Sequence, residues 1–270
     1  MPRHPAERHP VLAGAEAWSS PGEGALGRIG IVVVHGFTGN PCSTRPFGEA
    51  LARRGFAIEV PRLPGHGTHW RDMARTRYTD WRAEVEAAVA RVRERAHHVL
   101  LVGLSMGGAL VLDVACRDAK IAGVVPINAP VLDREGLLAR LAPLLEKVLP
   151  VVPASAAGLV ENDAARPGVD ERAYAWVPAA AGNSLLRELP RLREDLGHLH
   201  APVLVAWSAQ DHSVPPANSR AIARLAREAQ VEELVLERSF HLATLDLDAD
   251  LLEDRVAAFA ARCAGPPASP

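Results

Sequence analysis

The sequence contains few cysteines, and those it has do not form a recognisable framework. Cys42, Cys116 and Cys263 are far apart, and no C-x-x-C pair occurs. Three thiols at this spacing exclude a small disulfide-stapled secreted fold and a cysteine-based zinc site. We therefore expect the protein to belong in a reducing compartment, most simply the cytoplasm.

The chain also lacks a long apolar run and an excess of charge of one sign. No apolar run approaches the roughly 20 residues that a membrane-spanning helix needs. Residues 1–10 are rich in proline, arginine and histidine and lack the apolar centre of a signal peptide. The formal net charge is −2, with both signs interspersed. These features exclude a stable membrane anchor and argue against nucleic acid as a partner, but they leave the oligomeric state open.

The residues that are present favour one globular α/β domain over positions 1–270. Hydrophobic residues make up 48% of the chain, enough for a sizeable core. Short aliphatic runs indicate buried strands at 29–34, 56–60, 99–102, 121–127, 203–207 and 231–236. Helix-like segments lie between them at 46–54, 79–95, 106–117 and 217–228. This alternation predicts a mostly parallel central sheet flanked by helices on both faces.

One interval interrupts the alternation. From residue 129 to about residue 190 no clear strand is visible, although helical pieces such as 136–148 are present. About 60 residues without structure would be unusual inside a compact domain, so an ordinary long loop is the weaker interpretation. We expect a small helical cap, approximately residues 130–190, inserted after the sixth strand within the single domain.

A G-x-S-x-G motif at residues 103–107 predicts the nucleophile. It lies between the apolar run 99–102 and the helix-like segment that begins at Met106. On such a strand-to-helix turn, glycines on either side let the backbone pack closely while the Ser105 hydroxyl stays exposed. The helix N-terminus below it favours negative charge that develops on a substrate. The pattern is short, and its context gives it specificity.

A serine nucleophile needs a base and a carboxylate that orients the base. In a sheet of this kind they follow in the order serine, acid, histidine. Asp211 lies four residues after the run 203–207, and His241 follows the run 231–236, so both belong to loops at the carboxyl edge of the sheet. His212 is the competing base, but it lies on the same loop as the acid. Three later aspartates are interpreted as acids at a helix start: Asp246, Asp248 and Asp250.

Two backbone donors are needed for an oxyanion hole. The N–H of Met106 follows from the elbow, and the N–H of Phe37 is our choice from the glycine-containing loop 35–39. His35 is interpreted as a structural histidine that ties this loop down. The Gly/His loop 63–69 is expected to order the site rather than to bind a metal, because no carboxylate or cysteine has ligand spacing. We expect no metal and no organic cofactor.

With these residues the chain resembles the α/β-hydrolases, and more narrowly the small bacterial carboxylesterases and monoacylglycerol lipases. The resemblance extends over most of the chain and rests on six motifs, namely PVLAGAE (10–16), VHGFTG (34–39), PRLPGHGTH (61–69), GLSMGG (103–108), DHSVPP (211–216) and HLATLD (241–246).

The resemblance implies an α/β-hydrolase fold with a triad of Ser105, Asp211 and His241 and an oxyanion hole from the Phe37 and Met106 amides. It also implies a small-molecule substrate, a medium to long acyl ester of glycerol or of a simple alcohol. The segment 168–174 looks like the cap region that places a glycerol-contacting glutamate. Glu171 is therefore a candidate alcohol-pocket residue, the alternative being an exposed cap charge. Residues 151–166 depart from the family, so the acyl-chain preference is not predicted.

The sequence as a whole predicts a serine carboxylic ester hydrolase, like a monoacylglycerol lipase, that forms an acyl-enzyme. A short-chain carboxylesterase, a thioesterase or an acyltransferase could use the same residues, and a non-catalytic ligand-binding relative is a further alternative. Epoxide and haloalkane hydrolysis would need a carboxylate in place of Ser105.

Overall fold

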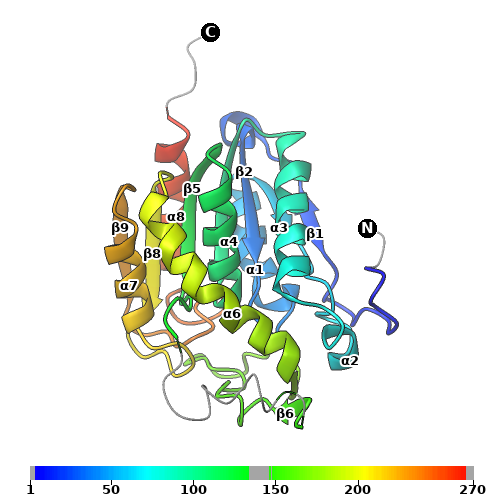
Figure 1. The fold of residues 1–270 in the computed structure, drawn as a ribbon. Coiled ribbons are helices and arrows are strands. Elements are labelled where there is room, and N and C mark those ends of the chain that lie inside the picture. The colour runs from blue at the N-terminus through cyan, green and yellow to red at the C-terminus, as the bar shows by residue number, and fades with distance from the viewer. Residues whose placement is uncertain (1–3, 134–145, 147, 266–270) are drawn as a thin grey trace.

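A computed structural model describes residues 4–133, 146 and 148–265. A seven-stranded sheet in the order β1-β3-β2-β4-β5-β8-β9 forms its centre (Figure 1). Only the pair β1–β3 is antiparallel, and the other neighbours run parallel. The strands are β1 (Trp18–Ser20), β2 (Ile29–Val34), β3 (Ala57–Val60), β4 (His98–Leu104), β5 (Ile121–Ile127), β8 (Val203–Ser208) and β9 (Val231–Leu236).

Helices cover both faces of the sheet. On one face lie α1 (Arg45–Arg53) and α8 (Ala249–Cys263), and on the other lie α3 (Tyr78–Arg93), α4 (Met106–Arg117), α6 (Ala179–Asp195) and α7 (Ala217–Leu225). The short α2 (Trp70–Met73) and the 3-10 turns η1 (Gly24–Arg28), η2 (Pro41–Ser43) and η3 (Leu196–His198) complete the described helical elements. The predicted parallel sheet between two helical layers is confirmed.

The strand sequence explains this sandwich. In β2, Ile31 and Val33 face the layer of α1 and α8, while Val32 and Val34 face the layer of α3 and α4. Successive side chains of a strand point to opposite faces, so a strand that is apolar throughout fits only where both faces are covered. Five of the six runs identified in the sequence as buried strands are therefore inner strands of the sheet. The sixth, 231–236, is the edge strand β9, and it is only partly buried.

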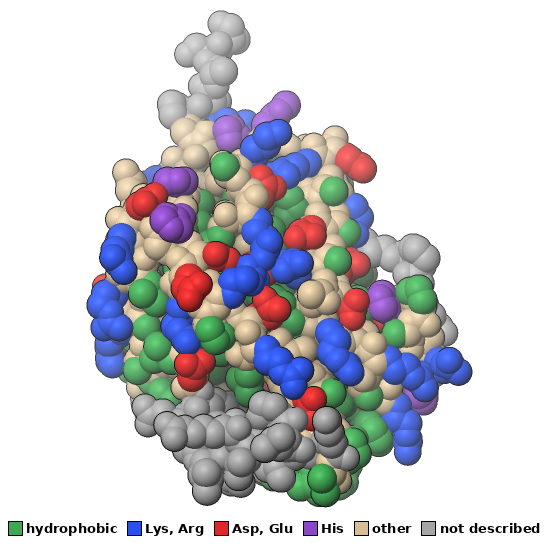
Figure 2. Space-filling model, in the orientation of Figure 1, with side chains coloured by type: hydrophobic (Ala, Val, Ile, Leu, Met, Phe, Trp, Pro, Cys, Tyr) green, Lys and Arg blue, Asp and Glu red, His purple; other side chains and the backbone are tan. Residues whose placement is uncertain are grey.

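The helix-covered face in Figure 2 carries basic and acidic side chains side by side. Beneath it, the fully buried Asp113 of α4 accepts from Arg117 in the same helix, from Arg82 of α3 and from Arg191 of α6. A buried carboxylate must be paired, and here the pairing joins three helices. None of the helices in the described part of the chain has both the length and the apolar character needed to cross a membrane.

Two expectations about strands are wrong. The sequence runs did not include β1, a three-residue edge strand of sequence Trp-Ser-Ser that has too little apolar character to stand out. Because β1 alone precedes β2 in the described residues, Ile121–Ile127 is the fifth strand, not the sixth. The insert therefore follows the fifth strand.

The insert also differs from expectation. Its described part holds a two-stranded antiparallel sheet of β6 (Val151–Pro153) and β7 (Trp176–Pro178), so the interval does contain strands. Runs of three residues are too short to show a periodicity, which is why the sequence did not predict them. The helix expected at 136–148 lies almost wholly outside the described residues. Helix α6 continues through Pro190 and packs on α4, so the expected boundary near 190 falls inside a helix of the flanking layer.

Candidate active site

Ser105 lies on a sharp turn between β4 and α4. Its φ of 56° and ψ of −124° are a strained conformation for a residue with a side chain. The backbone passes so closely here that a Cβ on Gly103 would lie 2.2 Å from the Gly107 oxygen, and a Cβ on Gly107 would lie 2.3 Å from the Val34 oxygen. The positions two residues before and two residues after the serine therefore both require glycine, as the elbow motif implies.

His241 and Asp211 form a directed pair. His241 Nδ1 lies 2.8 Å from Asp211 Oδ2, and the backbone N–H groups of Ser213 and Val214 donate to Asp211 Oδ1 at 2.8 and 2.7 Å. A carboxylate held in this way accepts from Nδ1–H and leaves His241 Nε2 free to act as a base. The two residues come from the loops after β8 and β9.

The electrostatics of His241 reflect two opposed influences. Burial by itself lowers its pKa, but the hydrogen bond and the charge of Asp211, together with Glu171 and Asp163, outweigh it and hold the pKa above its ordinary value. Negative charge around the ring stabilises an imidazolium, which is what a base becomes after it has taken a proton.

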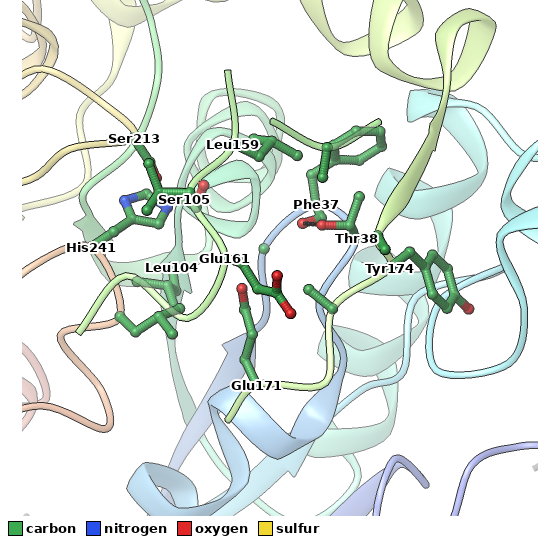
Figure 3. Close-up of a pocket in the computed structure, with 16 residues that line it drawn as sticks. Phe37, Thr38, Leu104, Ser105, Leu159, Glu161, Glu171, Tyr174, Ser213 and His241 are labelled. Carbon is green, nitrogen blue, oxygen red and sulfur yellow. Dashed lines mark hydrogen bonds between the residues drawn. The ribbon is translucent and has the colours of Figure 1, made fainter. Parts of the chain in front are cut away.

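Ser105 and His241 line one cavity at the carboxyl edge of the sheet. Figure 3 shows the His241 ring beside the Ser105 side chain, with Ser213 next to both. Among the described residues there is no hydrogen bond between the Ser105 hydroxyl and His241. Contacts of this kind commonly tighten only when a substrate binds.

The loop after β2 lies directly against the serine. A Cβ on Gly36 would stand 3.1 Å from the Ser105 Cβ, so a side chain at this position would press on the serine. Neither the Phe37 N–H nor the Met106 N–H has a hydrogen-bond partner in the part of the chain that the structure describes. Two unpaired donors beside a serine are the arrangement that an oxyanion hole needs.

His35 holds this loop in place. Its Nε2 accepts from the Leu63 N–H at 3.1 Å, and its Nδ1 lies 2.9 Å from the Gly36 oxygen. Burial lowers the pKa of His35 to about 4, so the ring is neutral and can donate through one nitrogen while accepting through the other. The predicted structural role of His35 is confirmed.

His212, the competing base, is bonded elsewhere. Its Nδ1 lies 2.7 Å from Oδ1 of Asp163, and its backbone N–H donates to the other Asp163 oxygen at 3.2 Å. Asp163 is buried and belongs to the insert, and its carbonyl accepts from Leu242 next to the candidate base. His212 therefore connects the acid loop to the insert.

The aspartates after His241 were only partly interpreted correctly. Asp250 lies in the first turn of α8, as expected. Asp246 is fully buried, and its carboxylate accepts the backbone N–H groups of Phe240, Ala165 and Arg166. Asp248 is also buried and accepts from the backbone of Arg238 and Ser239. Both side chains are directed at the loop of His241 rather than at the helix end.

Glu171 lies in the cavity rather than on an exposed surface. Burial raises the pKa of its carboxyl to about 7, and the charge of His241 opposes this rise. One carboxylate oxygen lies 3.0 Å from the position that a Cβ on Gly39 would occupy. Figure 3 shows Glu161 beside it, a second carboxylate lining the cavity that the sequence did not suggest.

Residues 28–248 match the family model described as serine aminopeptidase, S33 (Hydrolase_4), and this match includes every candidate residue above. The chain belongs to this family. A thermostable monoacylglycerol lipase of Bacillus sp. (strain H-257) is 36% identical over 96% of this chain and the whole of that protein. A carboxylesterase of Bacillus subtilis (strain 168) is 23% identical over 85% of this chain and 91% of that protein.

Solved structures agree with this assignment. One reported for the metagenome-derived lipolytic enzymes LipS and LipT has a TM-score of 0.85 at 37% identity, over 93% of this chain and 99% of that chain. The monoacylglycerol lipase of Paleococcus ferrophilus has a TM-score of 0.74 at 17% identity, over 92% of this chain and 97% of that one, which shows the shared fold alone. The protein is an α/β-hydrolase and a monoacylglycerol lipase-like serine hydrolase, as the sequence predicted.

Proposed function

We propose that the protein hydrolyses monoacylglycerols and related medium to long acyl esters with Ser105 as nucleophile, His241 as base and Asp211 as the orienting acid. The observation that carries this proposal is the His241–Asp211 pair, 2.8 Å apart, whose histidine lines one cavity together with the strained Ser105. The names of the relatives 36% and 37% identical to the chain, a monoacylglycerol lipase and lipolytic enzymes, support the same substrate class.

In the first half-reaction His241 Nε2 takes the Ser105 proton as Oγ attacks the ester carbonyl carbon. The carbonyl oxygen becomes an oxyanion that the Phe37 and Met106 N–H groups would bind. As the tetrahedral intermediate collapses, the C–O bond to the alcohol breaks and His241 returns the proton to the leaving oxygen. Water then repeats the sequence on the acyl-Ser105 ester and releases the acid. These steps require no metal and no organic cofactor.

The lining of the cavity suits an ester with one apolar and one polyol end. Leu159 and Val160 of the insert offer an apolar wall. Glu171 can accept hydrogen bonds from hydroxyl groups on the alcohol side, and we propose it as the alcohol-pocket residue. We also propose that the insert between β5 and α6 is a cap on a single domain, and that the protein works in the cytoplasm, because all three cysteines are unpaired thiols.

A substrate panel tests the proposal. It contains monoacylglycerols of graded chain length, p-nitrophenyl esters and an acyl thioester, each assayed with wild type and Ser105→Ala. We expect the highest kcat/KM on medium to long monoacylglycerols and its loss in the variant. Turnover confined to short simple esters would favour a general carboxylesterase, and preference for the thioester would favour a thioesterase. Absence of turnover would favour a non-catalytic ligand-binding relative.

A further inference from the structure

Asn128 is a buried polar residue at the end of β5, underneath the candidate triad. It is 1% exposed and has a φ of 48°, in the left-handed region that asparagine tolerates better than most residues with a side chain. A buried amide has to be hydrogen-bonded, so its partners show what it holds.

The side chain of Asn128 joins two loops. Its Oδ1 accepts from the backbone N–H of Ser208 at 2.8 Å, at the end of β8. Its Nδ2 donates to the carbonyl oxygen of His241 at 2.8 Å, and lies 3.2 Å from Ser208 Oγ and 3.4 Å from the Phe240 oxygen. Ser208 Oγ itself donates to the Phe240 oxygen at 2.6 Å. The backbone of the His241 loop is thereby fixed to the sheet.

The residue before Asn128 holds the nucleophile. The Ile127 carbonyl accepts from the Ser105 N–H at 2.8 Å. Two consecutive residues at the end of one strand therefore fix the backbones of both Ser105 and His241. Because a strand end is rigid, this arrangement sets the separation of the two side chains.

We infer that Asn128 is a positioning residue that fixes His241 relative to Ser105, an inference that rests on the proposed triad. The position requires a residue that tolerates a positive φ, accepts one hydrogen bond and donates another. Aspartate has no N–H to donate, so its carboxylate would face the carbonyl oxygens of Phe240 and His241. Glycine suits the φ but makes none of the side-chain bonds.

Asn128→Gly is the test variant, because it removes the side-chain bonds without adding backbone strain. Asn218→Ala is its matched control. Asn218 is also buried, at 7% exposure. Its side chain accepts from the backbone N–H groups of Val131 and Leu132 and donates to the Pro215 oxygen, and none of these hydrogen bonds reaches the loop of His241. Both variants lose a comparable set of buried hydrogen bonds, so both should lower the melting temperature.

We expect Asn128→Gly to lower kcat by roughly 10- to 100-fold, since a misplacement of about 1 Å can cost that much. KM should stay within about threefold, because Asn128 does not line the cavity. Asn218→Ala should retain kcat. Equal kcat losses in the two variants, or a change confined to KM, would overturn the inference. If Asn128→Gly does not fold, Ser208→Ala replaces it with the same criteria, because it removes the bond from Ser208 Oγ to the Phe240 oxygen and the bond from Asn128 Nδ2 to Ser208 Oγ.

Failure of the proposed function gives a different result. In that case wild type shows no ester hydrolysis that depends on Ser105. The position of His241 can then be followed without substrate, through the NMR resonance of the ring N–H proton shared with Asp211. We expect Asn128→Gly to shift or broaden this resonance and Asn218→Ala to leave it unchanged. An unchanged resonance in Asn128→Gly would contradict the positioning role.

Discussion

The carboxylate of Asp163 lies 2.7 Å from Nδ1 of His212, so the insert is bonded directly to the loop that carries Asp211. The backbone of the same aspartate is bonded to Leu242, next to His241. The insert thus contacts the loops of both the proposed acid and the proposed base.

Asp163→Ala should therefore destabilise the protein and weaken substrate binding. The substitution removes the hydrogen bonds of the carboxylate to the His212 ring and to the His212 backbone N–H, and a typical bond of this kind contributes about 0.5–1.5 kcal/mol. We expect a lower melting temperature and a higher KM, measured by thermal unfolding and by monoacylglycerol kinetics. Asp133→Ala is the control, because Asp133 pairs with Arg193 on the surface and such pairs contribute about 0–1 kcal/mol. Equal effects of the two variants would contradict a role for the Asp163 bonds.

The raised pKa of Glu171 predicts a pH dependence of stability. In the folded state its carboxyl stays protonated up to a pH of about 7, whereas in the unfolded chain it ionises near the ordinary value of 4.5. Between these values the folded state binds more protons, so the free energy of unfolding falls as pH rises through this window. Glu171→Gln should remove that part of the slope in denaturant titrations at pH 4.5 to 8. An identical pH slope in wild type and variant would show that Glu171 does not have the raised pKa.

The same linkage applies to His241 with its own window. Its folded pKa is raised, so its contribution to stability is complete below about 6.5 and is lost as pH rises through the folded value. His241 is present in both wild type and Glu171→Gln, so most of its contribution to the pH dependence of stability cancels when the two proteins are compared. The part that remains comes from the interaction between the charges of His241 and Glu171.

Asp211→Asn should affect both the rate and its pH profile. The neutral amide cannot hold the imidazole in the required tautomer, and in serine hydrolases of this mechanism the loss in kcat is roughly 10⁴-fold. Since Asp211 raises the pKa of His241, the acidic limb of kcat/KM should move to lower pH in the variant. A pH–rate series on a p-nitrophenyl ester measures both. If the acidic limb of kcat/KM stays at the same pH in the variant, a group other than His241 determines that limb.

Gly39→Ala tests the proposed alcohol pocket by moving the Glu171 carboxylate without replacing Glu171 itself. The new methyl group would lie 3.0 Å from a Glu171 oxygen and should displace that carboxylate. We expect a higher KM for monoacylglycerols and little change for p-nitrophenyl esters, which have no glycerol hydroxyls. Gly197→Ala is the control, because its methyl group would have no heavy atom within 4 Å. A parallel loss on both substrates would indicate a disturbed oxyanion loop instead.

The sequence was most informative about candidate catalytic residues that lie on a loop directly after a recognisable strand. Ser105, Asp211 and His241 each stand on the loop after an apolar run, so strand periodicity and chain order were enough to bring them together. Phe37 could be proposed for the same reason, from the loop after β2.

The other features of the site and the insert depend on tertiary contacts, which leave no pattern in the local sequence. An asparagine after a strand resembles any turn residue, so Asn128 is recognised only through its bonds to Ser208 and His241. Asp246 precedes a helix by three residues and resembled a helix-start acid, but its side chain is turned toward the loop of Phe240. The strands β6 and β7 pair across more than twenty intervening residues, which no short sequence window reveals.

The proposed mechanism depends above all on the activation of Ser105 by His241. A fluorophosphonate probe followed by peptide mass mapping tests it most directly, because the probe forms a covalent bond only with an activated serine. We expect a single modified residue, Ser105, with labelling that slows severely in His241→Ala and is absent in Ser105→Ala. Labelling at another serine, or labelling of Ser105 at an unchanged rate without His241, would contradict it.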